Sequence, residues 1–349
     1  MSGTKWMPVP RPLQSLFDRF PLVTYDANDL PARSPSHVHP LLQPHTSSPS
    51  NLPTLYVFIS EDDAVKNAPS FNPGCLKWQT FLKLAGVEFH VLPSTNHASP
   101  TGALPFLLPS TATTPSTTTN PASTDPPSKP TPPTEPSPPN KPVPSSRLYT
   151  YALNYHTRQN PQQPQQLQPP ASLFSDLPRK SEAYQSLLDL SIRNAWLYTL
   201  YLCPQKTHLL DALYVRPTST STWVQATTRH QLRRAAETEI LKSTSTSSTA
   251  GVVNPKAVYR EARLALEALA IQLGTSDSGW FFGAEQPTLF DASVFAYTYL
   301  MLKYLGGDEG DREGSLGAMV RNAGKGELAA HCRRLTEMLW PELSSELSQ

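Results

Sequence analysis

The sequence predicts a small α/β domain followed by an all-helical domain, and three observations indicate this order. An apolar run, an amphipathic stretch and a second apolar run follow one another in the first third of the chain, which is the pattern of a βαβ unit. A third strand-like run, "GALPFLLPS", contains a proline. Beyond residue 180 the chain carries several long stretches with apolar residues at helical spacing.

The α/β domain begins with "LPTLYVFIS", a nearly continuous apolar run that is typical of a buried strand. The following segment "NPGCLKWQTFLKLAG" predicts a helix that places Leu76, Thr80, Phe81 and Leu84 on one face and ends at Gly86. Next, "VEFHVLPS" alternates as a strand does. Because these two strands are joined through a helix, we expect them to be parallel.

The third strand is expected to begin at its proline. A proline cannot donate to a sheet ladder and is poorly tolerated in a central strand, so we expect Pro105 at the strand's first position, with a cis bond as an option.

The helical domain is predicted from five stretches. Asn254 stands as N-cap before Pro255, and Gly274 ends the helix that they begin. The last helix is stopped by Pro341. The stretches are "SEAYQSLLDLSIRNAWLYTLYLC", "STWVQATTRHQLRRAAETEIL", "NPKAVYREARLALEALAIQLG", "PTLFDASVFAYTYLMLKYLG" and "GELAAHCRRLTEMLW".

Low-complexity segments separate the folded parts, because they cannot bury enough apolar surface to offset their chain entropy. They are rich in Pro, Ser, Thr and Gln, and the chain has 38 prolines in all. We expect an N-terminal extension at 1–51, an α/β domain at 52–157 with a disordered insert at 109–146, a linker at 158–179, a helical domain at 180–341 and a tail at 342–349.

Composition excludes several classes of protein. A net charge of +1 argues against a generally basic nucleic-acid binder. The three cysteines are far apart and form no pattern of zinc ligands, so we expect neither a metal site nor a disulfide framework. The sequence begins with no recognisable signal or transit peptide and has no run of about 20 apolar residues, so we expect no membrane anchor of its own.

The stretch "WFFGAEQPTLFDASVFAY" places Thr288 and Asp291 three residues apart, just before an apolar helix. This is the spacing of a capping box with Asp in the N3 role. The combination resembles the N-capping box and central helix of the glutathione transferase C-terminal domain. We interpret both residues as structural.

The α/β domain resembles the thioredoxin-like half of the same superfamily, with Pro105 at the position of its cis-proline. In redox-active relatives the helix starts with Cys-Pro-x-Cys, and that motif falls here on Asn72, Pro73, Gly74 and Cys75. The attacking position is therefore an asparagine. We interpret Cys75 as a small structural core residue; the alternative is a reactive thiol at a helix N-terminus.

A glutathione transferase would need a Tyr or Ser near the end of the first strand, and Ser60 and Ser70 are available. It would also need an acid-Ser pair before the third helix. The equivalent stretch, "VPSSRLYTYAL", has Ser145 and Ser146 without an acid.

A non-catalytic branch of the superfamily combines these features. The segments "CLKWQTFLKLAGVEF", "NHASPTGALPFLL" and "FFGAEQPTLFDASVFAYTYL" resemble the metaxins and the smaller, peripheral metaxin-like subunit of the fungal mitochondrial sorting and assembly machinery. The resemblance implies a protein without catalytic residues or cofactors on the cytosolic face of the mitochondrial outer membrane. Its implied partners are a β-barrel assembly subunit, a second, larger metaxin-like subunit and β-barrel precursors.

We expect a precursor strand to bind beside the cis-proline, through the backbone of Leu104 next to Pro105. An active glutathione-dependent transferase of an unusual subclass is the alternative function.

Two further surfaces are candidates for partner or membrane contact. Arg229 and Arg233 share a helix face that could meet anionic lipid or an acidic partner, or could simply be solvated. Leu16, Phe17 and Phe20 have helical spacing and would dock on a partner or pack on their own domain.

Overall fold

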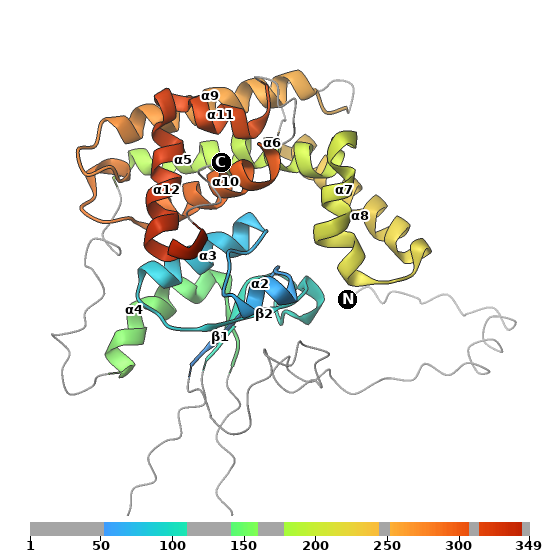
Figure 1. Cartoon of the computed structure of the whole chain (residues 1–349), viewed down its shortest axis with the longest axis horizontal. Coiled ribbons are helices and arrows are strands. Elements are labelled where there is room, and N and C mark those ends of the chain that lie inside the picture. Colours follow the sequence, from blue (N-terminus) through green and yellow to red (C-terminus); the bar gives the residue numbers. More distant parts are fainter. Residues whose placement is uncertain (1–51, 110–140, 160–177, 244–251, 307–313, 344–349) are drawn as a thin grey trace, which may run out of the picture. The chain divides into compact units, whose positions relative to one another are not determined.

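A computed structural model describes residues 52–109, 141–159, 178–243, 252–306 and 314–343. The first domain contains a four-stranded sheet in the order β2-β1-β3-β4. Strands β1 (Thr54–Val57) and β2 (His90–Pro93) are parallel, as predicted, whereas β3 (Phe106–Leu108) is antiparallel to both β1 and β4 (Val143–Pro144). Figure 1 shows the sheet with its helices.

Helix α3 (Pro73–Leu84) connects the two parallel strands, as the amphipathic pattern predicts. Asn72 caps its first turn and Pro73 occupies the first helical position, where a missing N–H costs nothing. Its buried face includes Leu76, Thr80 and Phe81. A short helix α2 (Glu61–Val65), begun by an acid-rich turn, precedes it and was not predicted.

The third strand begins directly after Pro105, and the Leu104–Pro105 bond is cis. In the register of the sheet Phe106 lies opposite Tyr56, and their rings stack with centroids 4.6 Å apart. One boundary was wrong. The segment 109–146 was expected to be a continuous disordered insert, but its last residues form β4 and the start of a 3₁₀ turn, Ser145–Arg147.

The rest of the described chain is helical. One irregular helix spans 180–202, in which α5 (Lys180–Leu187) and α6 (Arg193–Leu197) are each followed by a π-helical segment. The other helices are α4 (Leu148–Gln159), α7 (Thr207–Leu210), α8 (Thr222–Ser243), α9 (Pro255–Gly274), α10 (Leu289–Leu305), α11 (Leu316–Asn322) and α12 (Glu327–Leu339). The two short helices α7 and α11 were missed, because neither is long enough to show a helical period.

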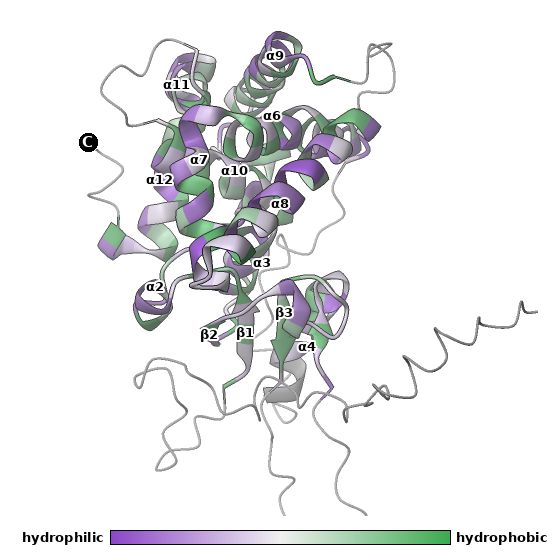
Figure 2. Cartoon of the chain, turned by 90° about the vertical axis from the view of Figure 1, so that its right-hand side faces the viewer, coloured by the Kyte–Doolittle hydropathy of each residue, from purple (hydrophilic) through white to green (hydrophobic). Residues whose placement is uncertain are grey.

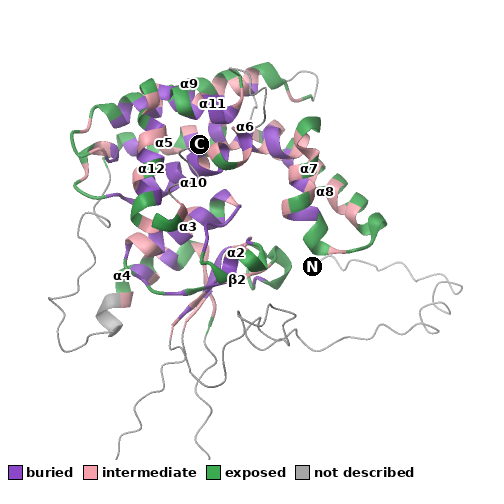
Figure 3. Ribbon diagram, viewed as in Figure 1, coloured by how far each residue is buried: buried purple, intermediate pink, exposed green. Residues whose placement is uncertain are grey.

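Helix α10 lies in the middle of the core. It is buried nearly all round, and Figure 3 shows this against the mostly exposed and half-buried residues of α8. The larger apolar cluster joins the helical domain to Phe71 and Leu76 of the first domain, while Ala292 of α10 belongs to the cluster around the sheet. The two domains therefore share their apolar cores.

A second connection between the domains is Trp340, which is fully buried just after α12. Its ring stacks on Phe295, and its Nε1 donates to the carbonyl of Asn67 in the first domain, at 2.9 Å. The ammonium of Lys83 on α3 lies 4.5 Å from the ring centroid and donates to the carbonyl of Leu339. Among the described residues no helix is long and apolar enough to cross a bilayer.

Candidate functional site

The start of α3 is the place where thioredoxin-like folds carry their chemistry, and here it is occupied by Asn72. Its Oδ1 accepts the N–H of Cys75 at 3.2 Å, which caps the helix. Its Nδ2 donates to the hydroxyl of Tyr214 at 3.1 Å. The side chain at the attacking position is thus an amide with both ends bonded, one of them to the helical domain.

Tyr214 closes this position from the side of the helical domain. Its ring packs against Phe58 and Phe71 with centroid distances of 5.5 and 5.2 Å, and against Tyr201 at 5.8 Å. Burial raises the pKa of Tyr214 well above its ordinary value and that of Tyr201 to about 12. Both phenols are therefore neutral at physiological pH, and neither is poised as a base or an anion.

Cys75 lies in the first turn of α3 and is fully buried. Burial raises the pKa of its thiol to about 12, and hydrogen bonds to the backbone of Phe58 and to Ser70 offset only part of that rise. At neutral pH the thiolate population is negligible, and the thiolate is the reactive form. The helix N-terminus does not activate this cysteine.

Ser70, a candidate for glutathione activation, is fully buried, and its hydroxyl is used twice. It donates to the carbonyl of Phe58 at 2.5 Å and accepts the N–H of Asn72 at 3.2 Å. The other candidate, Ser60, is the N-cap of α2, bonded to Asp63. The buried side chain of Gln79 was not singled out from the sequence. It accepts the N–H of Ser70 and donates to Ala68, and so fixes the loop before α3.

The cis-proline loop does not present the unpaired backbone donor that was expected for a bound strand. The N–H of Leu104 was expected to be available for a bound strand, but it donates to Oδ1 of Asn96 at 3.0 Å. The same loop is held by Ser99, whose hydroxyl donates to the carbonyl of Ala103 and accepts the N–H of Thr101. The expectation of a free donor was wrong, because an asparagine side chain eight residues earlier supplies an acceptor.

Ser145 and Ser146 lie in the 3₁₀ turn that leads from β4 into α4. The neighbouring charged residue is Arg147 rather than an acid. This is the position at which the resemblance to glutathione transferases implies an acid-Ser pair.

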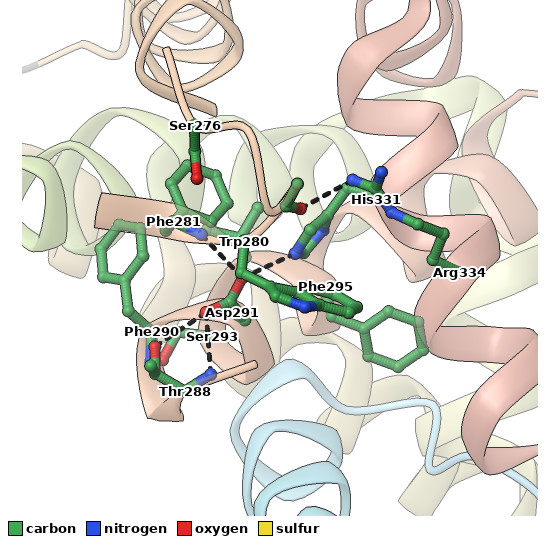
Figure 4. A network of polar contacts seen from close by, with 12 residues as sticks. Ser276, Trp280, Phe281, Thr288, Phe290, Asp291, Ser293, Phe295, His331 and Arg334 are labelled. Carbon is green, nitrogen blue, oxygen red and sulfur yellow. Dashed lines mark hydrogen bonds and ion pairs between the residues drawn. The ribbon is translucent and has the colours of Figure 1, made fainter. Parts of the chain in front are cut away.

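The capping box at α10 is present and fully buried. Oδ2 of Asp291 accepts the N–H and the hydroxyl of Thr288, both at 2.8 Å, and the Thr288 hydroxyl accepts the N–H of Phe290. Oδ1 of Asp291 accepts the N–H of Phe281 at 3.1 Å and also contacts His331. Figure 4 shows these contacts converging on the carboxylate.

His331 was not predicted as part of this network. Its Nε2 lies 3.0 Å from Oδ1 of Asp291, and its ring meets Trp280 and Phe281 edge to face. It comes from α12, 40 positions further along the chain, and a lone histidine on a helix gives no sequence signal for such a partner. The carboxylate therefore joins the start of α10, the turn at Phe281 and α12.

The two arginines of the expected contact face are used within the chain. Arg229 binds Asp211 through Nε and Nη2 at 2.7 and 2.9 Å, and Arg233 donates to the carbonyl of Tyr201 and the hydroxyl of Thr207. Each guanidinium therefore has a partner within the chain, whereas contact of this face with anionic lipid or an acidic partner stays a prediction. Leu16, Phe17 and Phe20 lie outside the described residues.

No cluster of three or more His, Cys, Asp or Glu side chains with the geometry of a metal site occurs in the ranges that the structure describes.

Two family models match the sequence. The glutathione S-transferase N-terminal domain matches residues 73–124, and the glutathione S-transferase C-terminal domain matches residues 262–335. The chain has the glutathione transferase fold. Among solved structures, glutathione transferase Omega 2S from Trametes versicolor is similar at 16% identity and a TM-score of 0.37, over 85% of this chain and 96% of that one. No curated protein matches the sequence.

Proposed function

We propose that this glutathione transferase-like chain is a non-enzymatic, peripheral subunit of the mitochondrial outer-membrane sorting and assembly machinery, which receives β-barrel precursors on the cytosolic face. The fold supplies the frame, and the resemblance to the smaller metaxin-like subunit supplies the role. The observation that carries the non-enzymatic part of the proposal is Asn72 at the start of α3.

Asn72 supports this reading because an amide can neither ionise nor attack a substrate. The same position is bonded to Tyr214 and surrounded by aromatic rings, so a thiol of glutathione would have to displace an interdomain hydrogen bond. The neighbouring hydroxyl of Ser70 and the thiol of Cys75 are buried. The residues of a former active site are thus used for packing the two domains together.

A precursor strand would bind at the cis-proline loop by displacing Asn96. Strand addition needs unpaired backbone donors, and both edges of the sheet are short and contain a proline, Pro93 in β2 and Pro144 in β4. The backbone at Leu104 is therefore a better binding site for a precursor strand than either sheet edge. The side-chain Oδ1 of Asn96 already occupies the position that a carbonyl oxygen of the bound strand would take.

The test of the assembly role is a pulldown of the tagged full chain from mitochondria in mild detergent, with mass spectrometry of the recovered proteins. We expect an outer-membrane β-barrel protein and a second metaxin-like chain in stoichiometric amounts. A chain recovered from the cytosol without either partner would overturn the proposal.

The strand site is tested with a peptide carrying a terminal β-barrel strand and the variant Asn96→Ala. Removing the competing acceptor should strengthen binding of the peptide by about fivefold, since a net hydrogen bond is worth about 1 kcal/mol. The exposed neighbour His97 provides the control His97→Ala, which should bind as the unmodified chain does. Equal affinity for Asn96→Ala would reject the cis-proline loop as the strand site.

A glutathione-dependent transferase is the second candidate, and the two glutathione S-transferase family matches favour it. Specific retention on immobilised glutathione, competed by free glutathione and lost when Ser146→Ala is introduced, would support it. The assembly role predicts no competed retention.

A further inference from the structure

Trp223 in the first turn of α8 is 85% exposed, and the next residue, Val224, is also exposed. The other tryptophans of the described chain are half-buried or buried, and Trp196 and Trp340 lie within the core. A tryptophan is among the largest apolar side chains, and leaving one in water forgoes a large share of the stabilisation that its burial would give. We therefore infer that Trp223, at the start of the long helix α8, is covered when the protein binds a partner or a surface.

The charge around Trp223 is positive on balance. Residues 212–236 contain four arginines and no aspartate or glutamate, and the next residue, Glu237, is an exposed acid on the same side of α8 as Trp223. The carboxylate that precedes this stretch, Asp211, is taken by Arg229. Arg216, His230 and Arg234 are exposed. Basic side chains therefore outnumber unpaired acidic ones around Trp223, with Glu237 as the acid that has no ion pair to an arginine among those described above.

Three of these groups share a face of α8. His230 and Arg234 follow Trp223 by seven and eleven residues, which places all three on one side of α8. The opposite side of the helix is fixed, because Arg229 and Arg233 bind the chain segment around α7. Figure 2 shows the predominantly hydrophilic colouring of α8 along its length.

The pattern does not fit a protein groove. A helix that binds in a groove presents apolar anchors on successive turns of one face. Here the turns after Trp223 carry Thr227, His230 and Arg234 instead. One aromatic side chain with cations behind it is the pattern of a helix at a lipid headgroup layer, where tryptophan is enriched and basic residues meet anionic lipids.

We propose that the lipid face, formed by Trp223, Val224, His230 and Arg234 of α8 together with Arg216 in the 3₁₀ turn that precedes this helix, binds the surface of an anionic membrane. Trp223 inserts at the level of the headgroups, and the two arginines and His230 lie against lipid phosphates. This deepens the proposed function, since it supplies the contact by which a peripheral subunit is held at a membrane, but its chemistry follows from the described surface alone.

The experiment is flotation of the purified full chain with vesicles of phosphatidylcholine, with and without phosphatidylserine. We expect binding only to the anionic vesicles and release at high salt, because the headgroup attraction is screened. Trp223→Ala should lower the partition coefficient at least fivefold, and Arg216→Gln and Arg234→Gln should each lower it about fivefold. Circular dichroism of each variant checks that the fold is retained.

Matched controls lie on α9, where Ile271 is 66% exposed and Arg260 is also exposed. Ile271→Ala and Arg260→Gln should float as the unmodified chain does. Equal flotation of Trp223→Ala, or no binding to anionic vesicles, would overturn the proposal, as would a Trp223→Ala chain that keeps vesicle binding and loses a protein partner in the pulldown. Since the vesicles contain no mitochondrial protein, this result is independent of whether the assembly role holds.

Discussion

The starts of α3 and α10 are built with the same device and serve different ends. Both helices begin with a side chain that accepts a backbone N–H, Asn72 at α3 and Thr288 at α10. At α10 the cap is completed by Asp291, which is fully buried and accepts hydrogen bonds from several segments. At α3 the cap is a neutral amide that also reaches Tyr214 in the other domain.

The difference teaches that a helix cap can fix one helix start or connect two domains. At α10 a buried carboxyl group is surrounded by donors from three segments, which fixes the helix start within the core. At α3 the second hydrogen bond of the cap residue connects the two domains. The following predictions test this comparison, from the largest effect to the smallest.

Replacing Asp291 should have the largest effect. Asp291→Ala leaves the N–H groups of Thr288 and Phe281 and the ring of His331 without their acceptor inside the core. We expect the free energy of unfolding to fall by about 3–5 kcal/mol, the range for breaking a buried charged network. Urea unfolding followed by circular dichroism measures it.

The control for this prediction is Glu337→Ala, which removes an exposed carboxylate from α12 and should change stability by less than about 0.5 kcal/mol. Asp291→Asn should fall between the two, since one oxygen remains as an acceptor. A loss below about 1 kcal/mol for Asp291→Ala would remove the contrast with α3.

Replacing Asn72 should have a moderate effect that divides into two parts. Asn72→Ala removes the cap and the bond to Tyr214, and we expect a loss of about 2 kcal/mol. Asn72→Ser keeps a good cap without reaching the Tyr214 hydroxyl, so about half of that loss should return. Thermal unfolding of the two variants and of Tyr214→Phe separates the parts; equal losses for Ser and Ala would mean that the cap contributes nothing.

The smallest effect concerns the thiols of the unmodified chain. Cys75 and Cys332 are buried with pKa values raised to about 12, whereas Cys203 is partly exposed. Iodoacetamide at pH 7–9 should therefore label Cys203 first and leave the two buried thiols unmodified until the protein unfolds. Peptide mapping by mass spectrometry identifies the site. Labelling of Cys75 in the folded chain would show that the start of α3 keeps a reactive thiol.

The same thiols make stability depend on pH in a definite direction. A cysteine whose folded pKa lies above its unfolded value favours the folded state fully below the unfolded pKa, near 9. That stability is lost as the pH rises from there towards 12, because the unfolded chain releases its protons first. The predicted alkaline loss should be smaller in Cys75→Ala.

Local patterns predicted the helix starts well, and distant partners could not be predicted. The spacing of Thr288 and Asp291 indicates the capping box, and Asn254 before a proline indicates the start of α9. The partner of Asn72, in contrast, lies 142 positions away. Nothing in the local sequence around Asn72 or Tyr214 indicates that these two residues contact each other.

Side-chain partners within the chain were missed at two of the predicted site residues, Arg229 and Leu104. The sequence places Arg229 on a helix face but does not show that Asp211 lies across from it. The sequence places Leu104 before the cis-proline, but it does not show that the loop brings the side chain of Asn96 to the Leu104 N–H. Tertiary contacts satisfied both groups, as buried or half-buried polar groups in a folded chain require.

The contact of Trp340 with Asn67 and Lys83 bears on how the chain is made. Domains fold as units, the N-terminal one first, while synthesis proceeds. Two groups of the first domain lack their partners until Trp340 has left the ribosome. The carbonyl of Asn67 accepts from the Trp340 indole, and the half-buried ammonium of Lys83 contacts that ring and the carbonyl of Leu339. During translation of the helical domain Leu76 of α3 likewise lacks the apolar cluster of that domain, in which it is fully buried in the folded protein.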